Sequence, residues 1–359
     1  MSTLTDTRRP PGGTILVTGF PGFLASNLIP RILTQRPDDQ VTCLVEPRFM
    51  DLANTRKAGY SPDVAARLHL AEGDITVPGL GLREALSPYQ IYHFAAIYEL
   101  NMSRASGLKV NVEGTRNVLR YAEHCSSLEL LHYVSTCYVS GRYAGPFRET
   151  DLDKGQRFNN FYEETKFLAE LEVQASSAPW IVYRPAIVVG DSRTGATLKY
   201  DGPYPVIRWL LRQPGLAVMP MLGDPSVARL NLVPQDYVLD ALTYLSLNQH
   251  QTRRVYQLAD PNPLTVSEMV NELGKDCRRW LLKLPVPLKP TKLALKAVPG
   301  VAQFTGFTPA MVDYFVHPTH YLTDHTEAAL QGSGLRCPDI RLVLPQLVSY
   351  VRRHPEPVG

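Results

Sequence analysis

The sequence lacks the features that mark membrane-spanning, disulfide-rich and strongly charged proteins. It contains no run of about 18 apolar residues, so we expect no transmembrane helix. The five cysteines are scattered, odd in number and include no Cys-x-x-Cys pair, which predicts reduced thiols and no metal site such as zinc. A net charge of +3 over 359 residues gives no general case for nucleic-acid binding. We therefore expect a cytoplasmic protein with a small-molecule substrate.

The length and composition predict one large domain or two closely associated ones. Apolar residues make up 44% of the chain and charged residues 20%, which is enough to bury a sizeable core. Residues 1–12 are polar and lack the apolar core of a signal peptide, so we expect a flexible tail.

A strand followed by a glycine turn opens the first structural unit. Thr14–Thr18 is short, apolar and β-branched, as in a buried parallel strand. The turn that follows has the spacing G-x-x-G-x-x-A, in which the second glycine lets backbone approach a pyrophosphate and Ala25 packs closely. The alternative is a plain strand-to-helix turn without a ligand. The residues expected to contact a dinucleotide here are Gly19, Phe20, Pro21, Gly22, Phe23 and Leu24.

The end of the second predicted strand bears on the choice of cofactor. Residues 41–45 form this strand, and Glu46 and Arg48 follow it, where the adenosine ribose usually lies. Glu46 could accept hydrogen bonds from the ribose hydroxyls, whereas Arg48 could pair with a 2′-phosphate. These two side chains favour NAD and NADP respectively, and two solvated loop charges are the alternative.

Strands alternate with helices over nearly 180 residues, which predicts an α/β fold with a doubly wound parallel (Rossmann) sheet. We expect, among others, a helix over 111–122, one strand over 181–190 and a short helix over 206–211. Ligands bind at the carboxyl ends of such strands. The residues at these predicted ends are Gly19, Asp74, Ala95, Thr136 and Pro185.

Two parts of the chain are expected to form the two lobes of the protein. The dinucleotide-binding domain comprises 13–190 plus 231–260. A smaller, mostly C-terminal substrate-binding lobe comprises 191–230 plus 261–359, where Gly, Pro and Tyr loosen the pattern at first.

Tyr162 and Lys166 are the strongest candidates for chemistry. Four residues apart on a helix, their side chains lie on one face. An ammonium group beside a phenol stabilises the phenolate, so the tyrosine could transfer a proton near neutral pH. The alternative is a surface helix with an ordinary Tyr and Lys.

Seven short motifs follow one another along the chain. They are 18–25 (TGFPGFLA), 73–75 (GDI), 93–96 (HFAA), 111–115 (NVEGT), 134–136 (VST), 162–166 (YEETK) and 183–185 (YRP). In order and spacing they resemble the extended short-chain dehydrogenase/reductase family (NAD-dependent epimerase/dehydratase-like) over about residues 14–260. The glycine turn and Asn231–Tyr237 are most similar to the branch of fatty acyl-CoA reductases and thioester reductase domains. Ala25 departs from the third glycine, and Glu46 stands where NADP-using members of that branch tend to carry arginine.

The resemblance implies a role for each candidate. Tyr162 would be the general acid or base, and Lys166 would lower its pKa and hold the nicotinamide ribose. Thr136, with Ser135 as its substitute, would hydrogen-bond the substrate oxygen. Asn111 would order a water chain or the helix behind Lys166. The remaining cofactor contacts implied are Asp74 and Ile75 at the adenine, Ala95 and Ala96 at a strand end, and Pro185 beside the nicotinamide amide.

Several of these residues also have structural interpretations. Thr136 and Ser135 could merely end a strand, Asn111 could be a helix N-cap, and Asp74 could be a turn residue.

A basic amphipathic segment, 275–296, stands out in the last third of the chain. It interleaves seven basic residues with Trp280 and several leucines. Such a segment can lie on an anionic membrane or meet an acidic, lipid-like ligand such as a CoA thioester. A solvated pair of helices covering the site is the alternative.

We therefore predict an NAD(P)-dependent oxidoreductase that transfers hydride to or from a carbonyl or hydroxyl carbon, with an acyl thioester or aldehyde as the narrower substrate hypothesis. The cofactor is NADP or NAD; the branch resemblance favours NADPH, and Glu46 opposes it. A nucleotide-sugar epimerase or dehydratase with recycled NAD is the rival, and a cofactor-sensing regulator without catalysis is a third class. Peripheral membrane contact and a homodimer are left open.

Overall fold

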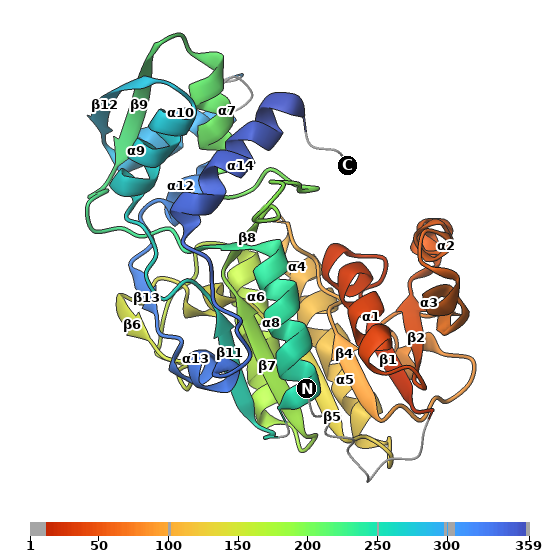
Figure 1. The fold of residues 1–359 in the computed structure, drawn as a ribbon. Coiled ribbons are helices and arrows are strands. Elements are labelled where there is room, and N and C mark those ends of the chain that lie inside the picture. Colours follow the sequence, from red (N-terminus) through yellow and green to blue (C-terminus); the bar gives the residue numbers. More distant parts are fainter. Residues whose placement is uncertain (1–11, 100–101, 250, 298–299, 301–305, 357–359) are drawn as a thin grey trace.

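A seven-stranded, all-parallel sheet forms the centre of the computed structural model (Figure 1). The structure describes residues 12–99, 102–249, 251–297, 300 and 306–356; most of the predicted N-terminal tail therefore lies outside the described residues. The strands run in the order β11-β7-β5-β4-β1-β2-β3, which confirms the predicted doubly wound α/β fold. The strand bounds are β1 Thr14–Thr18, β2 Gln40–Val45, β3 Leu68–Glu72, β4 Gln90–His93, β5 Leu130–Val134, β7 Trp180–Pro185 and β11 Arg254–Leu258.

Alternate residues of these strands enter two separate apolar clusters, one on each face of the sheet. Ile15 and Val17 of β1 belong to the cluster that α1 and α8 cover, and Leu16 belongs to the cluster under α5 and α6. This period of two explains why the strands read as continuous apolar runs in the sequence. The helices of this domain are α1 Phe23–Gln35, α2 Met50–Ala58, α3 Pro62–Ala66, α4 Arg104–Gly107, α5 Gly114–Glu123, α6 Phe161–Ala175 and α8 Gln235–Asn248. One helix from the segment predicted to belong to the second lobe, α13 Asp324–Leu330, packs on β11 and α8 of this domain.

Short helical turns and two small strand pairs complete the domain and its junction with the lobe. The 3₁₀ turns are η1 Pro47–Phe49, η2 Pro78–Gly81 and η4 Cys137–Ser140, and η3 Leu108–Glu113 is a π-helical turn. The small parallel pairs are β6 Gly145–Phe147 with β13 Thr319–Tyr321, and β8 Ile187–Val189 with β10 Leu232–Pro234.

A second lobe with its own core lies beyond the carboxyl ends of the central strands (Figure 1). A two-stranded parallel sheet, β9 with β12, packs against α7, α9 and α14. In the part of the chain that the structure describes, no helix combines the length and the apolar character needed to cross a bilayer. The elements of the lobe are α7 Tyr204–Arg212, β9 Leu216–Leu222, α9 Val266–Asp276, β12 Trp280–Val286, α10 Leu288–Ala297, α12 Pro309–Tyr314 and α14 Ile340–Arg353.

Three local predictions differ from the structure. The helix expected to open at Asn111 begins earlier, because Ser103 caps α4 by accepting a hydrogen bond from the Ser106 N–H, and the π-helical turn η3 then continues α4 into α5. Asn111 is therefore inside a helix and is not an N-cap. The strand expected over 181–190 is two strands, because residues after Pro185 leave the central sheet and pair with β10. The segment 275–296 is a helix end, a strand and a helix, not a pair of helices.

A buried ion pair joins the central sheet to the helix that carries Tyr162 and Lys166. Arg184 on β7 and Glu170 on α6 are both fully buried, and Arg184 Nη2 lies 2.6 Å from Glu170 Oε1. The guanidinium also donates to the Asp151 carbonyl oxygen. Removal of one partner would leave an uncompensated buried charge, so the pair fixes α6 against the sheet.

Candidate functional site

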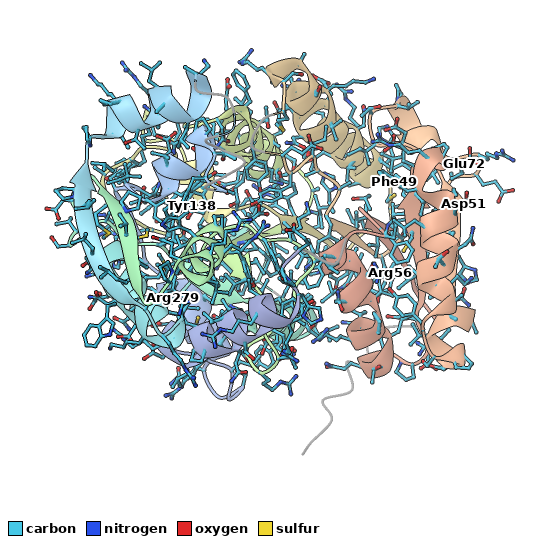
Figure 2. All side chains as sticks on the ribbon, turned by 90° about the horizontal axis from the view of Figure 1, so that it is seen from above. Phe49, Asp51, Arg56, Glu72, Tyr138 and Arg279 are labelled. Carbon is cyan, nitrogen blue, oxygen red and sulfur yellow. The ribbon has the colours of Figure 1, made fainter. Side chains whose placement is uncertain are left out.

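A cleft of about 1000 Å³ lies at the carboxyl ends of the central strands. Its floor is formed by the glycine turn and the ends of the strands, and its opposite wall by residues of the second lobe. Phe49 and Tyr138, which both line this cleft, lie well apart in the view from above (Figure 2). The structure brings all of the predicted site residues to this cleft except Asn111.

The glycine turn approaches its neighbours too closely for a side chain. Gly19 has a φ of +88°, and a Cβ there would lie 2.6 Å from the Ala95 nitrogen, so only glycine fits. The Gly22 N–H donates to the Gly19 carbonyl oxygen at 2.8 Å. A Cβ on Gly22 would meet that same oxygen at 2.6 Å.

The first turn of α1 adds a feature that suits a phosphate group. Its N-cap residue is Gly22, and no side chain caps the helix. The free backbone N–H groups and the positive end of the helix dipole therefore face the cleft beside the tight turn. These residues fit the pyrophosphate of a dinucleotide.

A buried histidine holds the ends of two central strands together. The Thr18 hydroxyl is hydrogen-bonded to His93 Nδ1 at 2.7 Å, and His93 Nε2 is 3.0 Å from the Thr115 hydroxyl. The Ala95 N–H in turn donates to the Thr18 hydroxyl at 3.2 Å. Burial lowers the pKa of His93 to about 3, so this ring is a neutral positioning group rather than a proton donor.

Glu46 and Arg48 bind each other at the adenosine end of the cleft. Arg48 Nε lies 2.8 Å from Glu46 Oε1, and Arg48 Nη2 donates to Oε2 at 2.9 Å. The Arg48 guanidinium also stacks over the Phe49 ring at 4.7 Å. Each charge is therefore neutralised by the other, and neither side chain alone decides between NAD and NADP.

Asp74 lies at the end of β3 and is both a turn residue and a cleft residue. Its Oδ1 accepts a hydrogen bond from the Thr76 N–H at 2.7 Å, which is an Asx turn. Ile75 lines the cleft beside it and also packs against Gly114, where an added Cβ would lie 2.6 Å from the isoleucine side chain.

Lys166 is 3% exposed and is held by the strand beneath it. Its Nζ donates to the Tyr133 hydroxyl at 2.8 Å and to the Val134 carbonyl oxygen at 2.7 Å. Desolvation lowers the pKa of Lys166 to about 7, although the nearby Glu170 carboxylate opposes this shift. The ammonium group therefore titrates near neutrality.

Tyr162 lies one helical turn before Lys166 and lines the same cleft. Desolvation raises the pKa of Tyr162, and its hydrogen bond with the Thr136 side chain lowers that pKa in part. The expected lowering of this pKa by Lys166 is not what the structure shows, since the Lys166 ammonium is directed to Tyr133 and Val134. The Tyr98 ring contacts the Tyr162 ring edge-on at 4.9 Å between centroids.

The two hydroxyls at the end of β5 differ in their bonding. Thr136 accepts from the Tyr138 N–H at 3.3 Å and donates to the Pro185 carbonyl oxygen at 3.4 Å. Ser135 is buried, and its hydroxyl has no partner among the described residues. A buried unpaired hydroxyl on a cleft wall is a candidate ligand contact, because leaving it unbonded is costly.

Asn111 acts behind the cleft rather than in it. Its Oδ1 accepts from the Ile97 N–H at 2.8 Å, and its Nδ2 donates to the Thr165 hydroxyl at 3.0 Å. Thr165 precedes Lys166 on α6, so Asn111 ties the loop after β4 to the helix behind Lys166.

Sequence reasoning missed several residues of this site, most of them aromatic. Tyr133, the partner of Lys166, reads as one more residue of a buried strand and carries no distinguishing signal. Four further residues form the wall from loops and from a distant helix, which no local pattern reveals. They are Tyr98, Tyr138, Lys199 and Tyr314.

The chain matches the family described as Male sterility protein, a family of NAD-binding domains, over residues 17–242. It belongs to this family, and with it to the extended short-chain dehydrogenase/reductases, a class of NAD(P)-dependent oxidoreductases. The family predicted from the seven motifs is thus confirmed.

Similar proteins include reductases and parts of large synthetases. The chain is 28% identical to a Linear gramicidin synthase polypeptide of Brevibacillus parabrevis, over 71% of its own length and 5% of the synthase polypeptide. It is 24% identical to Fatty acyl-CoA reductase wat of Drosophila melanogaster, over 67% of this chain and 56% of that one. The chain thus spans only part of these relatives. Among solved structures, the terminal R domain of the myxalamid PKS-NRPS pathway superposes with a TM-score of 0.79 at 27% identity, over 96% and 91% of the two chains.

Proposed function

We propose that this protein reduces the carbonyl carbon of an acyl thioester or an aldehyde with NADPH or NADH. The observation that carries the proposal is that Tyr162 and Thr136 line one cleft with an apolar wall, close enough for the Thr136 side chain to lower the pKa of Tyr162. A hydroxyl pair of this kind can hold a carbonyl oxygen and give it a proton as charge develops.

Each residue has a role in this proposal. Thr136 turns its hydroxyl from the Pro185 carbonyl oxygen to donate to the substrate oxygen, and Tyr162 delivers the proton to that oxygen. The reduced nicotinamide cofactor, when bound, supplies the hydride to the carbonyl carbon. If the substrate is a thioester, the tetrahedral oxygen returns its proton to Tyr162 as the carbon–sulfur bond breaks, and a thiolate leaves as the aldehyde forms. Lys166, anchored to Tyr133 and Val134 at the floor of the site, would donate a hydrogen bond to the ribose hydroxyls of the cofactor.

The walls of the cleft favour an acyl group as the substrate. Leu198, Leu230, Met311 and Phe315 line the lobe side. An acyl chain gains roughly 0.8 kcal/mol for each methylene that such a wall buries. A sugar gains nothing from it. The fatty acyl-CoA and aldehyde reductases among the relatives support the same choice.

The rival function is a nucleotide-sugar epimerase or dehydratase. It is supported by fold alone, through structures such as the Bordetella bronchiseptica enzyme WbmG with NAD, which superposes with a TM-score of 0.64 at 19% identity over 97% and 96% of the two chains. NAD that stays bound through purification favours this rival, and freely exchanging cofactor favours the reductase.

An acyl-length series tests the proposal. Catalytic efficiency with acyl-CoA thioesters and with aldehydes should rise by up to about fourfold for each methylene buried. Met311→Ala should flatten the rise, because it shortens the apolar wall. Val227→Ala, at an exposed position outside the cleft, is the matched control. A response independent of chain length, together with turnover of a UDP-sugar, would overturn the proposal.

A further inference from the structure

The small sheet of the second lobe has one face made entirely of apolar residues. Strands β9 and β12 pair in parallel, with Leu216 opposite Trp280 and each following residue opposite the next. Since alternate residues of a strand share a face, every second pair points the same way. The residues of this face, here called the apolar ridge, are Leu216, Val218, Pro220, Leu222, Trp280, Leu282, Leu284 and Val286.

The apolar ridge faces away from the core of its own lobe except at Leu222, which packs partly against that core. On the opposite face of β9, Ala217, Met219 and Met221 are buried in the lobe core. On the ridge, by contrast, Trp280 is 82% exposed and Leu216 is 61% exposed. Five of the fourteen exposed large apolar side chains among the described residues belong to it. In both views β12 forms an outer edge of the molecule (Figures 1 and 2).

A parallel sheet is rarely left uncovered in this way. Parallel sheets are normally buried on both faces. Single exposed apolar side chains need no explanation, whereas a contiguous patch marks an interaction site.

The chain around the apolar ridge is strongly basic. Residues 275–296 hold seven basic side chains and one acidic one, Asp276, for a net charge of +6, against +3 for the whole protein. Some of these cations are already paired, as Lys275 is with Glu272 and Lys292 with Asp313. The exposed cations for which the described residues provide no ion pair are Arg278, Lys289 and Lys296.

We propose that the apolar ridge and these cations dock the protein on an anionic lipid bilayer. An exposed tryptophan and leucines can enter the headgroup region, while flanking lysines meet lipid phosphates. This combination of apolar and basic side chains matches the chemistry of such a surface.

Two other occupants fit less well. A second copy of this chain would bring two segments of charge +6 face to face, which repel each other. A stable protein partner needs about 800 Å² on each side. The ridge is only about 20 Å long and two strands wide, and its exposed side chains together present roughly 500 Å², which is below that size. A bilayer needs no complementary shape and can accept this narrow ridge.

The ridge is also connected to the cleft. Strand β12 leads into α10, and Lys292 of α10 is ion-paired with Asp313 of α12. Met311 and Tyr314 of the same helix line the cleft. A docked molecule would thus hold this wall of the cleft close to the lipid surface. Docking itself does not depend on the proposed reaction.

Vesicle sedimentation tests the proposal directly. The full chain should sediment with vesicles of phosphatidylcholine and phosphatidylglycerol, and weakly or not at all with phosphatidylcholine alone. Lys289→Glu combined with Lys296→Glu should weaken binding to the anionic vesicles at least about tenfold. Trp280→Ser combined with Leu282→Ser should weaken it by a similar factor.

Matched controls and one spectroscopic signal sharpen this test. Val77→Ser and Arg83→Glu alter an exposed apolar residue and an exposed cation of the dinucleotide-binding domain, away from the ridge, and both should bind like wild type. Of the other two tryptophans, Trp180 is buried and Trp209 packs partly buried against the lobe core, so most of an emission shift to shorter wavelength on lipid binding should disappear in Trp280→Phe.

Three results would overturn the assignment. They are no sedimentation with anionic vesicles, equal losses in the control variants, or a lipid-free dimer in which Trp280 is shielded from a soluble quencher. The last result would assign the ridge to a second copy of the chain.

Discussion

The two parallel sheets of this protein differ in burial, since the central sheet is covered on both faces and the small sheet on only one. The central sheet sends alternate side chains into two buried clusters, and the residues that line its cleft lie where the strands end. The β9–β12 sheet buries one face and leaves the other in solvent. We therefore propose that function in the first sheet belongs to its strand ends, and in the second to its exposed face.

The largest effect is expected from removing the Tyr162 hydroxyl, which tests whether the chemistry lies at the strand ends of the central sheet. Tyr162→Phe should lower turnover by about 100- to 10,000-fold, because the proton donor is lost while the ring remains. Cofactor affinity, measured by fluorescence titration, should stay close to wild type. Tyr98→Phe, which keeps the ring that contacts Tyr162, is the control and should lose less than about tenfold. Near-normal turnover of folded Tyr162→Phe would remove this residue from the chemistry.

The glycine turn offers a second test of the strand ends. Gly22→Asp should weaken both NADH and NADPH by about 10- to 100-fold, because a carboxylate would stand where the pyrophosphate binds. The added Cβ would also press on the Gly19 oxygen, so the turn must shift. Gly215→Asp is the control, since open space surrounds that glycine. Unchanged dissociation constants would mean that the turn does not hold phosphate.

Glu163 links helix α6 of the central domain to the second lobe, and its protonation should make the stability of the protein depend on pH. It is fully buried on α6, accepts hydrogen bonds from Asn159 and is hydrogen-bonded to Tyr314 of the lobe. Burial raises the pKa of Glu163 to about 7. A carboxyl group with a raised folded-state pKa stabilises the protein at low pH, and this contribution is lost as pH rises through that value.

Glu163→Gln should remove this pH dependence. Between pH 5 and pH 8, the free energy of unfolding of wild type should fall by roughly 2 kcal/mol relative to the variant. Denaturant titrations at several pH values measure this difference. Glu164→Gln, which alters an ion pair with Arg104, is the control and should follow the wild-type curve. Parallel curves for wild type and Glu163→Gln would show that the carboxyl group does not titrate in this range.

Much of the central sheet could be predicted from the sequence, because its signals are local. A buried strand followed by glycines or hydroxyls marks both an element and its functional end, as at Gly19 and Thr136. The partner of Lys166 could not be found in this way. Tyr133 belongs to another element and resembles its apolar neighbours in the strand.

The apolar ridge was hidden for a different reason. Strand β12 pairs with β9, more than 60 residues earlier, and no local pattern reports such a contact. Leu281 interrupts the alternation of apolar residues, so the segment also reads as an amphipathic helix. The basic residues and Trp280 are visible in the sequence, but the exposed sheet face beside which they lie is not.

The smallest expected effect concerns Arg48, and it separates two interpretations of the adenosine end. The Arg48 side chain is 67% exposed and its guanidinium is bound to Glu46. An incoming 2′-phosphate must therefore replace Glu46 as the partner of Arg48, which reduces the binding free energy that the new ion pair contributes. Arg48→Ala should consequently weaken NADPH binding only about tenfold, near the lower limit for a charge-assisted contact. NADH should bind as well as before or better, since Glu46 is then free to accept the ribose hydroxyls. Glu46→Ala should act in the opposite direction and strengthen NADPH. Dissociation constants for both cofactors in the two variants measure these signs, and equal losses for NADH and NADPH in Arg48→Ala would mean that Arg48 serves the loop through its contact with Phe49.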